Sequence, residues 1–372
     1  MTNAPSKYDG TFWDNKYWYP PALSWELVEK ARAEGHTLAY PNDLKFVFPY
    51  IIAILIFRFL FERLIGIPFA KYCLGTLAHR RSPEECEKLE KLYINAKNKS
   101  TPENPFIPDG WTPARVARWY RRRRNMDRPD MVKKFSETSY RFFCYVFLWG
   151  YGLWALHDKI WVYDTVQCWV NFPFQDLDPE IYFYYLIELA FYCTLCISLF
   201  SDVRRKDFTE QIIHHIATIT LITCSYCANF TRVGTLVIII HDASDVWLEG
   251  AKLFVYCRKN KIADQLFTVF AIVFLVTRDL VYPYMVLHTT WVKSMWLYTP
   301  YFGYYAFNAF LFIIMILNLF WSFTILRMAY RMSKDDSGVE NDDRSDAEEF
   351  SDDADDASNV VLSSAVEDKK DK

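Results

Sequence analysis

Two apolar stretches of the sequence, residues 208–228 and 233–256, carry ionisable side chains where a membrane helix normally has none. The first contains two adjacent histidines, and the second contains one histidine and three acids: His214, His215, His241, Asp242, Asp245 and Glu249. A titratable group at membrane depth is costly unless it faces a partner or a cavity. We therefore expect this cluster to be a functional site.

The spacing of the second group predicts which side chains share a helix face. His241, Asp245 and Glu249 recur at intervals of four residues, so they lie on one face, with Asp242 about 100° around the helix. Two neighbouring helices that run in opposite directions would bring the histidine pair and Asp245 to nearly the same depth, at about 1.5 Å of rise per residue. We expect an imidazole and a carboxylate to face each other there.

An imidazole beside a carboxylate can carry out several kinds of chemistry. It can deprotonate a nucleophile or accept an acyl group itself, while the carboxylate fixes its tautomer and stabilises the imidazolium, and these functions suit acyl transfer to an amine. The same residue types also suit a zinc site, a proton relay in a transporter, or hydrogen-bonded structural positions. A transporter is expected to show internal repeats or broken helices at matching positions, and the sequence indicates neither.

The composition indicates an all-α integral membrane protein with about seven transmembrane helices. Of the 372 residues, 52% are hydrophobic and 18% are aromatic, which is more apolar than an ordinary soluble fold. Windows that are long and apolar enough to cross a bilayer lie at residues 44–66, 137–157, 181–200, 208–228, 233–256, 262–287 and 303–330.

The distribution of lysine and arginine predicts the orientation in the membrane, because basic residues near span ends stay on the cytosolic side. Basic connections follow the first, third, fifth and seventh windows, and the other connections carry few such residues. The N-terminus is therefore predicted to be lumenal and the C-terminus cytosolic. The first window is long enough to remain in the membrane as a signal anchor.

These patterns divide the chain into five predicted parts. Residues 1–43 are a lumenal segment rich in aromatic side chains that suit the membrane interface, and residues 44–66 are the first transmembrane helix. Residues 67–132 are a cytosolic segment, 133–334 a membrane domain that contains the ionisable cluster, and 335–372 a disordered acidic cytosolic tail. In the tail, Ser345 has the acidic context of a phosphorylation site, and Lys369 and Lys370 match a signal for retrieval to the endoplasmic reticulum.

The cytosolic segment is predicted to contain two helices, one beginning at Ser82-Pro83 and one at Thr112-Pro113. The second continues through WYRRRR at residues 119–124 and resembles the recognition helix of a homeodomain. Arg122 stands where that family has an adenine-reading asparagine, and the segment is tethered to membrane spans at both ends, so nucleic-acid binding is not expected. We interpret it as a basic cytosolic helix beside anionic lipid headgroups.

Four short runs of sequence resemble the Lag1 motif of ceramide synthases, and they include the ionisable cluster. They are Asp202-Val203-Arg204-Arg205-Lys206-Asp207-Phe208, Ile213-His214-His215, His241-Asp242-Ala243-Ser244-Asp245 and Leu248-Glu249-Gly250-Ala251-Lys252. The homeodomain-like segment is similar to that of the animal members of this family. The resemblance to the TRAM-Lag1-CLN8 domain family extends over nearly the whole chain.

The resemblance implies an acyltransferase of the endoplasmic reticulum membrane. Its expected reaction, that of a sphingosine N-acyltransferase, joins a fatty acyl group from acyl-CoA to the amine of a sphingoid base, sphinganine or sphingosine, and gives dihydroceramide or ceramide. It implies no metal and no organic cofactor. The catalytic residues that it implies are His214, His215, Asp242 and Asp245. We expect the substrates to be bound by Arg204, Arg205, Lys206, His241 and Glu249.

Three further properties stay open from the sequence. The alternative function is that of a non-enzymatic membrane lipid carrier or translocation partner of the same domain family. The oligomeric state is open, with a homo- or hetero-dimer as one alternative. In the family, acyl chain-length preference is associated with the connection between the last two spans, which here comprises residues 288–302.

Overall fold

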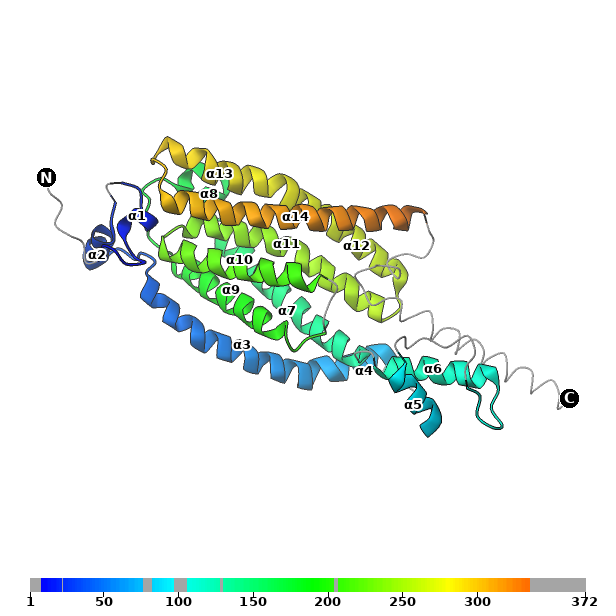
Figure 1. Ribbon diagram of the computed structural model, residues 1–372. Helices are drawn as coiled ribbons and strands as arrows, with labels where there is room; N and C mark the ends of the chain where they lie inside the picture. The colour runs from blue at the N-terminus through cyan, green and yellow to red at the C-terminus, as the bar shows by residue number, and fades with distance from the viewer. Residues whose placement is uncertain are drawn as a thin grey trace.

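The computed structural model describes residues 8–21, 23–75, 82–96, 106–127, 130–203 and 207–334. Within these ranges, all regular secondary structure is helical. Long helices lie side by side in one elongated bundle, with α1 and α2 at one end and α4 at the other (Figure 1). We call these two ends of the bundle the α1 end and the α4 end.

The long helices of the bundle correspond to the apolar windows of the sequence. Their bounds are α3 (Val47–Phe61) with α4 (Ile67–Leu74), α7 (Met131–Leu156), α9 (Pro179–Ser198), α10 (Phe208–Cys227), α11 (Thr231–Tyr256), α12 (Asn260–Phe274) with α13 (His288–Trp291), and α14 (Phe302–Lys334). The connections contain a short helix α8 (Ile160–Tyr163) and 3₁₀ turns at Pro41–Phe46, Thr165–Cys168 and Lys293–Trp296. Between α12 and α13 the chain continues as π-helix, at Leu275–Val281 and Pro283–Leu287.

Four helical segments of the described chain are long and apolar enough to cross a membrane, judged by length and composition: Pro41–Leu74, Pro179–Ser198, Asn260–Trp296 and Phe302–Lys334. Helices α7, α10 and α11 contain more polar and charged side chains, and all three contribute to the site described below. The prediction of an all-α membrane protein is confirmed. The count of seven spans stays a prediction.

The first membrane helix is longer than its predicted window of 44–66. It continues through a π-helical turn at Glu62–Gly66 and ends at Leu74. Apolar packing stabilises the extension, because Ala70 and Leu74 share a core cluster with Phe135 of α7. Gly66 lies so close to Ser136 that a Cβ atom at residue 66 would overlap the serine side chain. Close contact with α7 therefore carries the helix beyond the apolar window.

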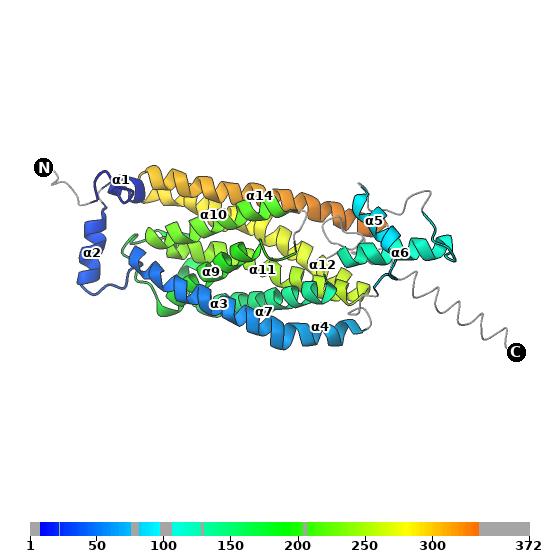
Figure 2. The same cartoon turned by 60° about the horizontal axis from the view of Figure 1, so that its bottom comes forward.

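Two short helices, α1 (Asn15–Trp18) and α2 (Trp25–Ala33), close the α1 end of the bundle (Figure 2). Trp18, Tyr19 and Trp25 are buried there, and the rings of Tyr19 and Trp25 meet edge to face with centroids 5.0 Å apart. Large aromatic rings provide much apolar surface for burial. Trp18, Tyr19 and Trp25 therefore pack inside the protein at this end, and the position of the segment at the membrane interface stays a prediction.

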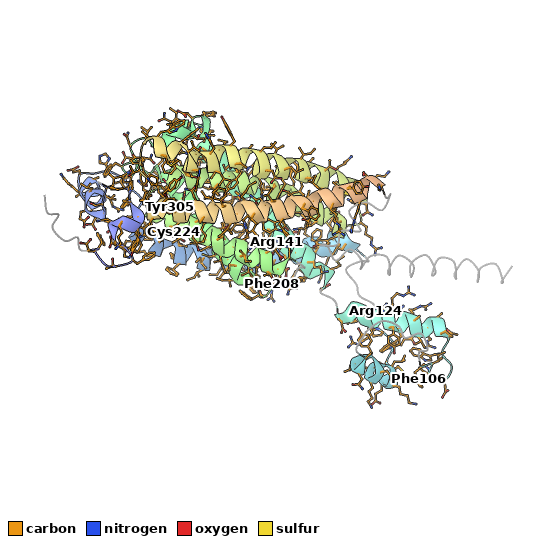
Figure 3. All side chains as sticks on the ribbon, turned by 45° about the horizontal axis from the view of Figure 1, so that its top comes forward. Phe106, Arg124, Arg141, Phe208, Cys224 and Tyr305 are labelled. Atoms are coloured by element: carbon orange, nitrogen blue, oxygen red, sulfur yellow. The ribbon has the colours of Figure 1, made fainter. Side chains whose placement is uncertain are left out.

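A small helical unit, formed by α5 (Glu87–Asn95) and α6 (Pro113–Asp127), lies beyond the α4 end (Figure 3). The two helices share a core made of Leu89, Tyr93, Val116, Trp119 and Tyr120. Both aromatic residues at the start of the WYRRRR run are thus used for packing between α5 and α6. The likeness of this unit to a homeodomain stays a prediction.

One helix of this unit begins later than the sequence predicts. Helix α6 begins at Pro113 as expected, but the first helix begins at Glu87 rather than at Ser82. The carbonyl of Glu84 accepts a hydrogen bond from the Trp119 indole at 2.7 Å, and the Glu84 carboxylate forms an ion pair with Arg115. These contacts with α6 hold residues 82–86 in a non-helical conformation.

The arrangement of α9, α10, α11, α12 and α14 positions the site. Helix α11 packs against α7 and α12, and α10 packs against α9, α11 and α14 (Figure 2). Only residues 228–230 separate α10 from α11, so the two helices run in opposite directions. Asn229 forms this turn with a φ of 57°, and its buried amide donates to the carbonyls of Pro173 and Gln175.

Candidate active site

Two cavities meet inside the bundle between α9, α10 and α11. The first extends from His214 toward the α1 end, is lined mainly by apolar and aromatic side chains, and contains about 980 Å³ of space not filled by protein atoms, part of it open to the surroundings. The second extends toward the α4 end, is lined by many charged side chains, and contains about 1860 Å³, which includes space open to the surroundings. We call them the apolar cavity and the polar cavity. Tyr192 and His214 line both.

The adjacent histidines lie on α10, with ring centroids 5.6 Å apart. His214 meets Trp321 of α14 edge to face at 5.4 Å, and His215 lies 6.1 Å from Tyr192 of α9, again between ring centroids. The Nδ1 atom of each histidine is buried and has no hydrogen-bond partner among the described residues. His214 and His215 therefore each have a ring nitrogen to which no described residue is hydrogen-bonded.

Asp242 lies on α11 and is fully buried. One of its carboxylate oxygens, Oδ1, accepts a hydrogen bond from the Tyr192 hydroxyl at 3.0 Å. Its other side faces the carboxyl group of Glu188, which lies one turn before Tyr192 on α9. Tyr192 thus connects Asp242 to the junction of the two cavities.

Asp245 lies one turn further along α11 and forms an ion pair with Arg278. The guanidinium Nη2 of Arg278 donates to Asp245 at 2.9 Å and to the backbone carbonyl of His241 at 2.7 Å. Arg278 is 4% exposed and stacks over Phe274, with its guanidinium carbon 4.6 Å from the ring centroid. It belongs to the π-helical stretch Leu275–Val281, and such bulges are common at functional sites.

The predicted contact between an imidazole and a carboxylate is not present in the part of the chain that the structure describes. The histidines and the acids do lie around one junction, since His214, His215 and Asp245 all line the polar cavity. Asp245 binds Arg278 instead, because a guanidinium provides a charge-assisted hydrogen bond at that depth. Among the described residues, Tyr192 is the cavity-lining side chain that donates a hydrogen bond to Asp242.

His241 is set apart from the other two histidines by its hydrogen bonds. Its Nδ1 lies 2.7 Å from the backbone carbonyl of Val237, which can only accept, so Nδ1 carries the hydrogen. Its Nε2 lies 3.3 Å from the amide nitrogen of Asn318 and can accept from it. The ring lines the apolar cavity and meets Tyr282 edge to face. His241 is therefore anchored at both nitrogens.

Glu249 lies near the α4 end, within a network of charged side chains. It pairs with Lys252 at 2.6 Å and with Arg141 at 3.2 Å, and Arg141 also pairs with Asp202 at 3.3 Å. Asp202 in turn pairs with Arg58 of α3 at 2.5 Å. The network joins α3, α7 and α11 to the segment that follows α9. Glu249 and Arg141 line the polar cavity, and Figure 3 labels Arg141.

Three predicted substrate-binding residues, Arg204, Arg205 and Lys206, lie outside the described residues, so their role stays a prediction. The residues on either side of them, Val203 and Asp207, line the polar cavity. The zinc alternative receives no support within the described ranges, where no group of three or more His, Cys, Asp or Glu side chains is arranged to hold a metal ion.

Three residues of the site were not among the predicted ones: Glu188, Tyr192 and Arg278. Glu188 and Arg278 carry a sequence signal, because both are ionisable and lie inside the predicted windows 181–200 and 262–287. Tyr192 carries none, since it is one of 25 tyrosines in the chain. Its contact with Asp242 becomes visible only when α9 is placed against α11.

Comparison with known proteins defines the class of this fold. The TLC domain family, which groups TRAM, LAG1 and CLN8 proteins, matches residues 134–327, the part of the chain that contains the site. Human ceramide synthase 4 is 39% identical over 349 residues, covering 92% of this chain and 87% of the human protein.

Two other relatives match the chain over a similar share of its length. Human ceramide synthase 5 is 37% identical over 352 residues, covering 93% of this chain and 88% of that protein. Ceramide synthase hyl-1 of Caenorhabditis elegans is 32% identical over 348 residues, covering 90% of this chain and 84% of that protein. The chain belongs to the ceramide synthase family of TLC domain proteins.

Proposed function

We propose that this member of the ceramide synthase family transfers a fatty acyl group from acyl-CoA to the amine of a sphingoid base, sphinganine or sphingosine, to give dihydroceramide or ceramide. The relatives that match this chain over most of their own length are named ceramide synthases. The structural observation that supports the proposal most is the position of His214, which lines both an apolar and a polar cavity.

The apolar cavity has the chemistry that a fatty acyl chain requires. On α10 its lining runs from His214 to Ser225, which corresponds to about 16 Å of helix axis at 1.5 Å per residue. Leu221, Val237 and Ile314 provide apolar walls. An acyl chain in this cavity would have its carbonyl end at His214 and its methyl end toward the α1 end.

The polar cavity suits the polar part of a lipid substrate. Arg141, Lys252 and Arg278 are among its lining residues, and a highly charged coenzyme A group cannot enter lipid. We infer that acyl-CoA enters from the α4 end, which the distribution of lysine and arginine predicts to face the cytosol. The residues 204–206 would then stand close to the coenzyme A phosphates.

His214 is the residue proposed to react, because its imidazole stands where both cavities meet. It either accepts the acyl group or takes a proton from the sphingoid amine. His215 supports it from the polar side. Arg278, which Asp245 holds in place, supplies a fixed positive charge in the same cavity, and such a charge stabilises the oxyanion that forms at a thioester carbonyl.

The cellular setting is proposed from the sequence and the fold together. The protein is a multi-pass membrane protein, and its terminal lysines Lys369 and Lys370 favour the endoplasmic reticulum. We propose a lumenal N-terminus and a cytosolic C-terminus. The alternative of a non-enzymatic lipid carrier is not favoured, because the relatives that match almost the whole chain are named as synthases.

The proposal is tested with purified protein in lipid nanodiscs, given a sphingoid base and a series of acyl-CoA thioesters of different chain length. Ceramide should form only when both substrates are present, with release of one free coenzyme A thiol per ceramide. Free fatty acid in place of acyl-CoA serves as the control. Binding of both lipids without any product would support the carrier and contradict the acyltransferase.

A further inference from the structure

Glu188 is a fully buried acid on α9 that the reaction described above does not use. Neither of its carboxyl oxygens has a donor among the described residues, and Oδ2 of Asp242 has none either. The two carboxyl groups lie within hydrogen-bond reach of each other. They form a buried pair, here called the carboxyl pair.

The described surroundings of the carboxyl pair include no ion-pair partner for it. Tyr184 and Tyr192 of α9 and Tyr145 of α7 lie around it, and Asp245 lies beside Asp242 on α11. Arg278, a buried cation in the π-helical stretch Leu275–Val281, forms its ion pair with Asp245, and it acts on Asp242 only through its charge. Within the described chain, neither Glu188 nor Asp242 takes part in an ion pair.

Two carboxylates in contact, away from water and without an ion-pair partner, cannot both be ionised. The pair therefore holds at least one proton, and the hydrogen bond that the Tyr192 hydroxyl donates to Asp242 favours Asp242 as the member that stays ionised. A buried arrangement of this kind is costly in a membrane protein, and such groups usually serve proton transfer or substrate binding. Substrate cannot touch this pair directly, because both acids are fully buried and line neither cavity.

Tyr192 links the pair to the place where substrates meet. Its hydroxyl donates to Asp242 at 3.0 Å, and its side chain lines both cavities beside His214. A phenol can donate one hydrogen bond and accept another, so it can pass a proton from a cavity to the carboxylate behind it. His215 is the titratable group next to Tyr192 on α10.

We propose that Tyr192, Asp242 and Glu188 form a proton relay that removes one proton from the sphingoid ammonium during acyl transfer. This inference rests on the proposed function. Tyr192 is the member that would touch the substrate, whereas Glu188 acts through Asp242 and is a positioning residue.

The need for a proton acceptor follows from the chemistry of the substrate. A primary alkylamine has an ordinary pKa of about 10, so a sphingoid base reaches the site mainly as the ammonium ion. The ammonium cannot attack a carbonyl until it loses a proton, and the amine nitrogen loses a second proton when it becomes an amide. Two protons must therefore leave the nitrogen in each turnover.

The relay and the departing imidazole each take one of these two protons. If His214 carries the acyl group, the amine nitrogen forms a bond to the acyl carbon and the bond from that carbon to the imidazole breaks. One proton goes to the departing imidazole nitrogen. The other goes to the Tyr192 oxygen as the Tyr192 hydroxyl proton moves to Asp242, so the carboxyl pair then holds two protons. Reverse passage through Tyr192 returns the extra proton to water in the polar cavity.

The preceding step needs no relay. When acyl-CoA reacts with His214, the carbon–sulfur bond breaks, the imidazole forms a bond to the acyl carbon, and the imidazole proton goes to the coenzyme A thiolate. No proton is left for the carboxyl pair. Loss of the relay should therefore slow transfer to the amine and leave thiol release unchanged.

The test separates the two half-reactions in purified protein. Glu188→Gln and Tyr192→Phe are compared with the wild-type chain for thiol release with acyl-CoA alone, and then for ceramide formation on addition of sphinganine. We expect Glu188→Gln to release thiol at the wild-type rate, and we expect both variants to form ceramide more slowly by roughly 100-fold near pH 7, the scale of general acid–base catalysis. Raising the pH should restore part of the rate, because more free amine is then supplied.

Tyr185→Phe is the matched control. Tyr185 is also a buried tyrosine of α9, but it is hydrogen-bonded to Ser225 at 3.0 Å and lines neither cavity. Its variant should keep both half-reactions. Thermal unfolding of all three variants shows whether the bundle is intact. If Glu188→Gln does not fold, ceramide formation by Tyr192→Phe tests the relay.

Several outcomes would overturn the relay. Ceramide formation by Glu188→Gln and Tyr192→Phe at the wild-type rate would exclude it, and equal slowing of both half-reactions would assign these residues a structural role. If the wild-type chain releases no thiol without sphinganine, the pH profile decides: a loss confined to low pH supports the relay, and a loss independent of pH contradicts it. Failure of the wild-type chain to make any ceramide would instead count against the proposed function.

Discussion

The three histidines that line the two cavities differ in what their ring nitrogens contact. His241 is bonded at Nδ1 to Val237 and faces Asn318 at Nε2. His214 and His215 have buried Nδ1 atoms without a partner among the described residues. A nitrogen that is already hydrogen-bonded at rest is poorly suited to attack a carbonyl. This difference favours His214 and His215 over His241 as reacting groups.

The ion pair between Asp245 and Arg278 leads to a prediction for both stability and activity. Asp245→Asn should leave a buried guanidinium without its counter-charge, which typically costs about 3–5 kcal/mol. Acyl transfer should fall by roughly 100-fold or more, because the fixed charge near the thioester is then held less firmly. Thermal unfolding and ceramide formation by the same preparation measure the two effects.

A second substitution separates these effects. The double variant Asp245→Asn, Arg278→Gln has no uncompensated charge, so it should regain most of the lost stability while ceramide formation stays low. If the double variant recovers activity together with stability, Arg278 acts only in folding.

At this scale the sequence could indicate which residues matter but not which of them touch. Ionisable groups inside apolar windows stand out in the sequence, and this criterion selects His214 and Asp245 as well as Glu188 and Arg278. Which side chains they contact depends on the rotation of each helix about its axis. The side-chain direction changes by about 100° from one residue to the next. The expected imidazole–carboxylate contact was replaced by Tyr192 and Arg278 for this reason.

Among the elements of the fold, the connection between α12 and α14 closes the apolar cavity at the α1 end. Ser294, Tyr298 and Tyr301, all within residues 288–302, line that end. Replacing residues 288–302 by the corresponding segment of a relative with a different acyl preference should shift the length of the acyl chain incorporated. Competition between acyl-CoA thioesters of several lengths measures the shift. An unchanged profile in an active chimaera would show that other residues set the length.

Contact between α9 and α11 depends on a glycine. A Cβ atom at Gly234 would overlap the Tyr185 ring, so Gly234→Ala must push the helices apart or displace the tyrosine. We expect a loss of about 1–3 kcal/mol in stability, as for overpacked cores. The matched control is Gly150→Ala on α7, where a Cβ atom meets nothing within 4 Å. The prediction is wrong if the two variants unfold at the same temperature.

The helices themselves could be predicted better than their ends. Apolar windows located the long helices because apolar length is a property of the sequence alone. The end of the first span at Leu74 and the start of α5 at Glu87 depend on contacts with α7 and α6, which no window contains. The π-helix around Arg278 was not predicted from the sequence, and it contacts α11 and α14.

On the scale of the whole molecule, the site lies inside the bundle, and the tail of residues 335–372 lies outside the described residues. Deleting the tail should leave a folded protein that still makes ceramide, because the residues that line both cavities are all retained. The truncated protein should leave the endoplasmic reticulum in part, since Lys369 and Lys370 are lost. Fractionation of cells and assay of each membrane fraction measure both results.

A variant with Lys369→Ser and Lys370→Ser alone controls for the retrieval signal. It should be mislocated to the same extent as the deletion while keeping the rest of the tail. An inactive truncation that stays in the endoplasmic reticulum would mean that the tail takes part in folding or catalysis.

We infer that the imidazoles at the junction of the two cavities carry out the transfer. The most direct measurement is the rate of ceramide formation by purified His214→Ala, His215→Ala protein, with thermal unfolding as the check on folding. Loss of a nucleophile or base should lower the rate by roughly 1,000-fold or more, and folding should be kept because a neutral side chain is cheaper than an ionisable one in the membrane. Ceramide formation near the wild-type rate by this double variant would contradict the account.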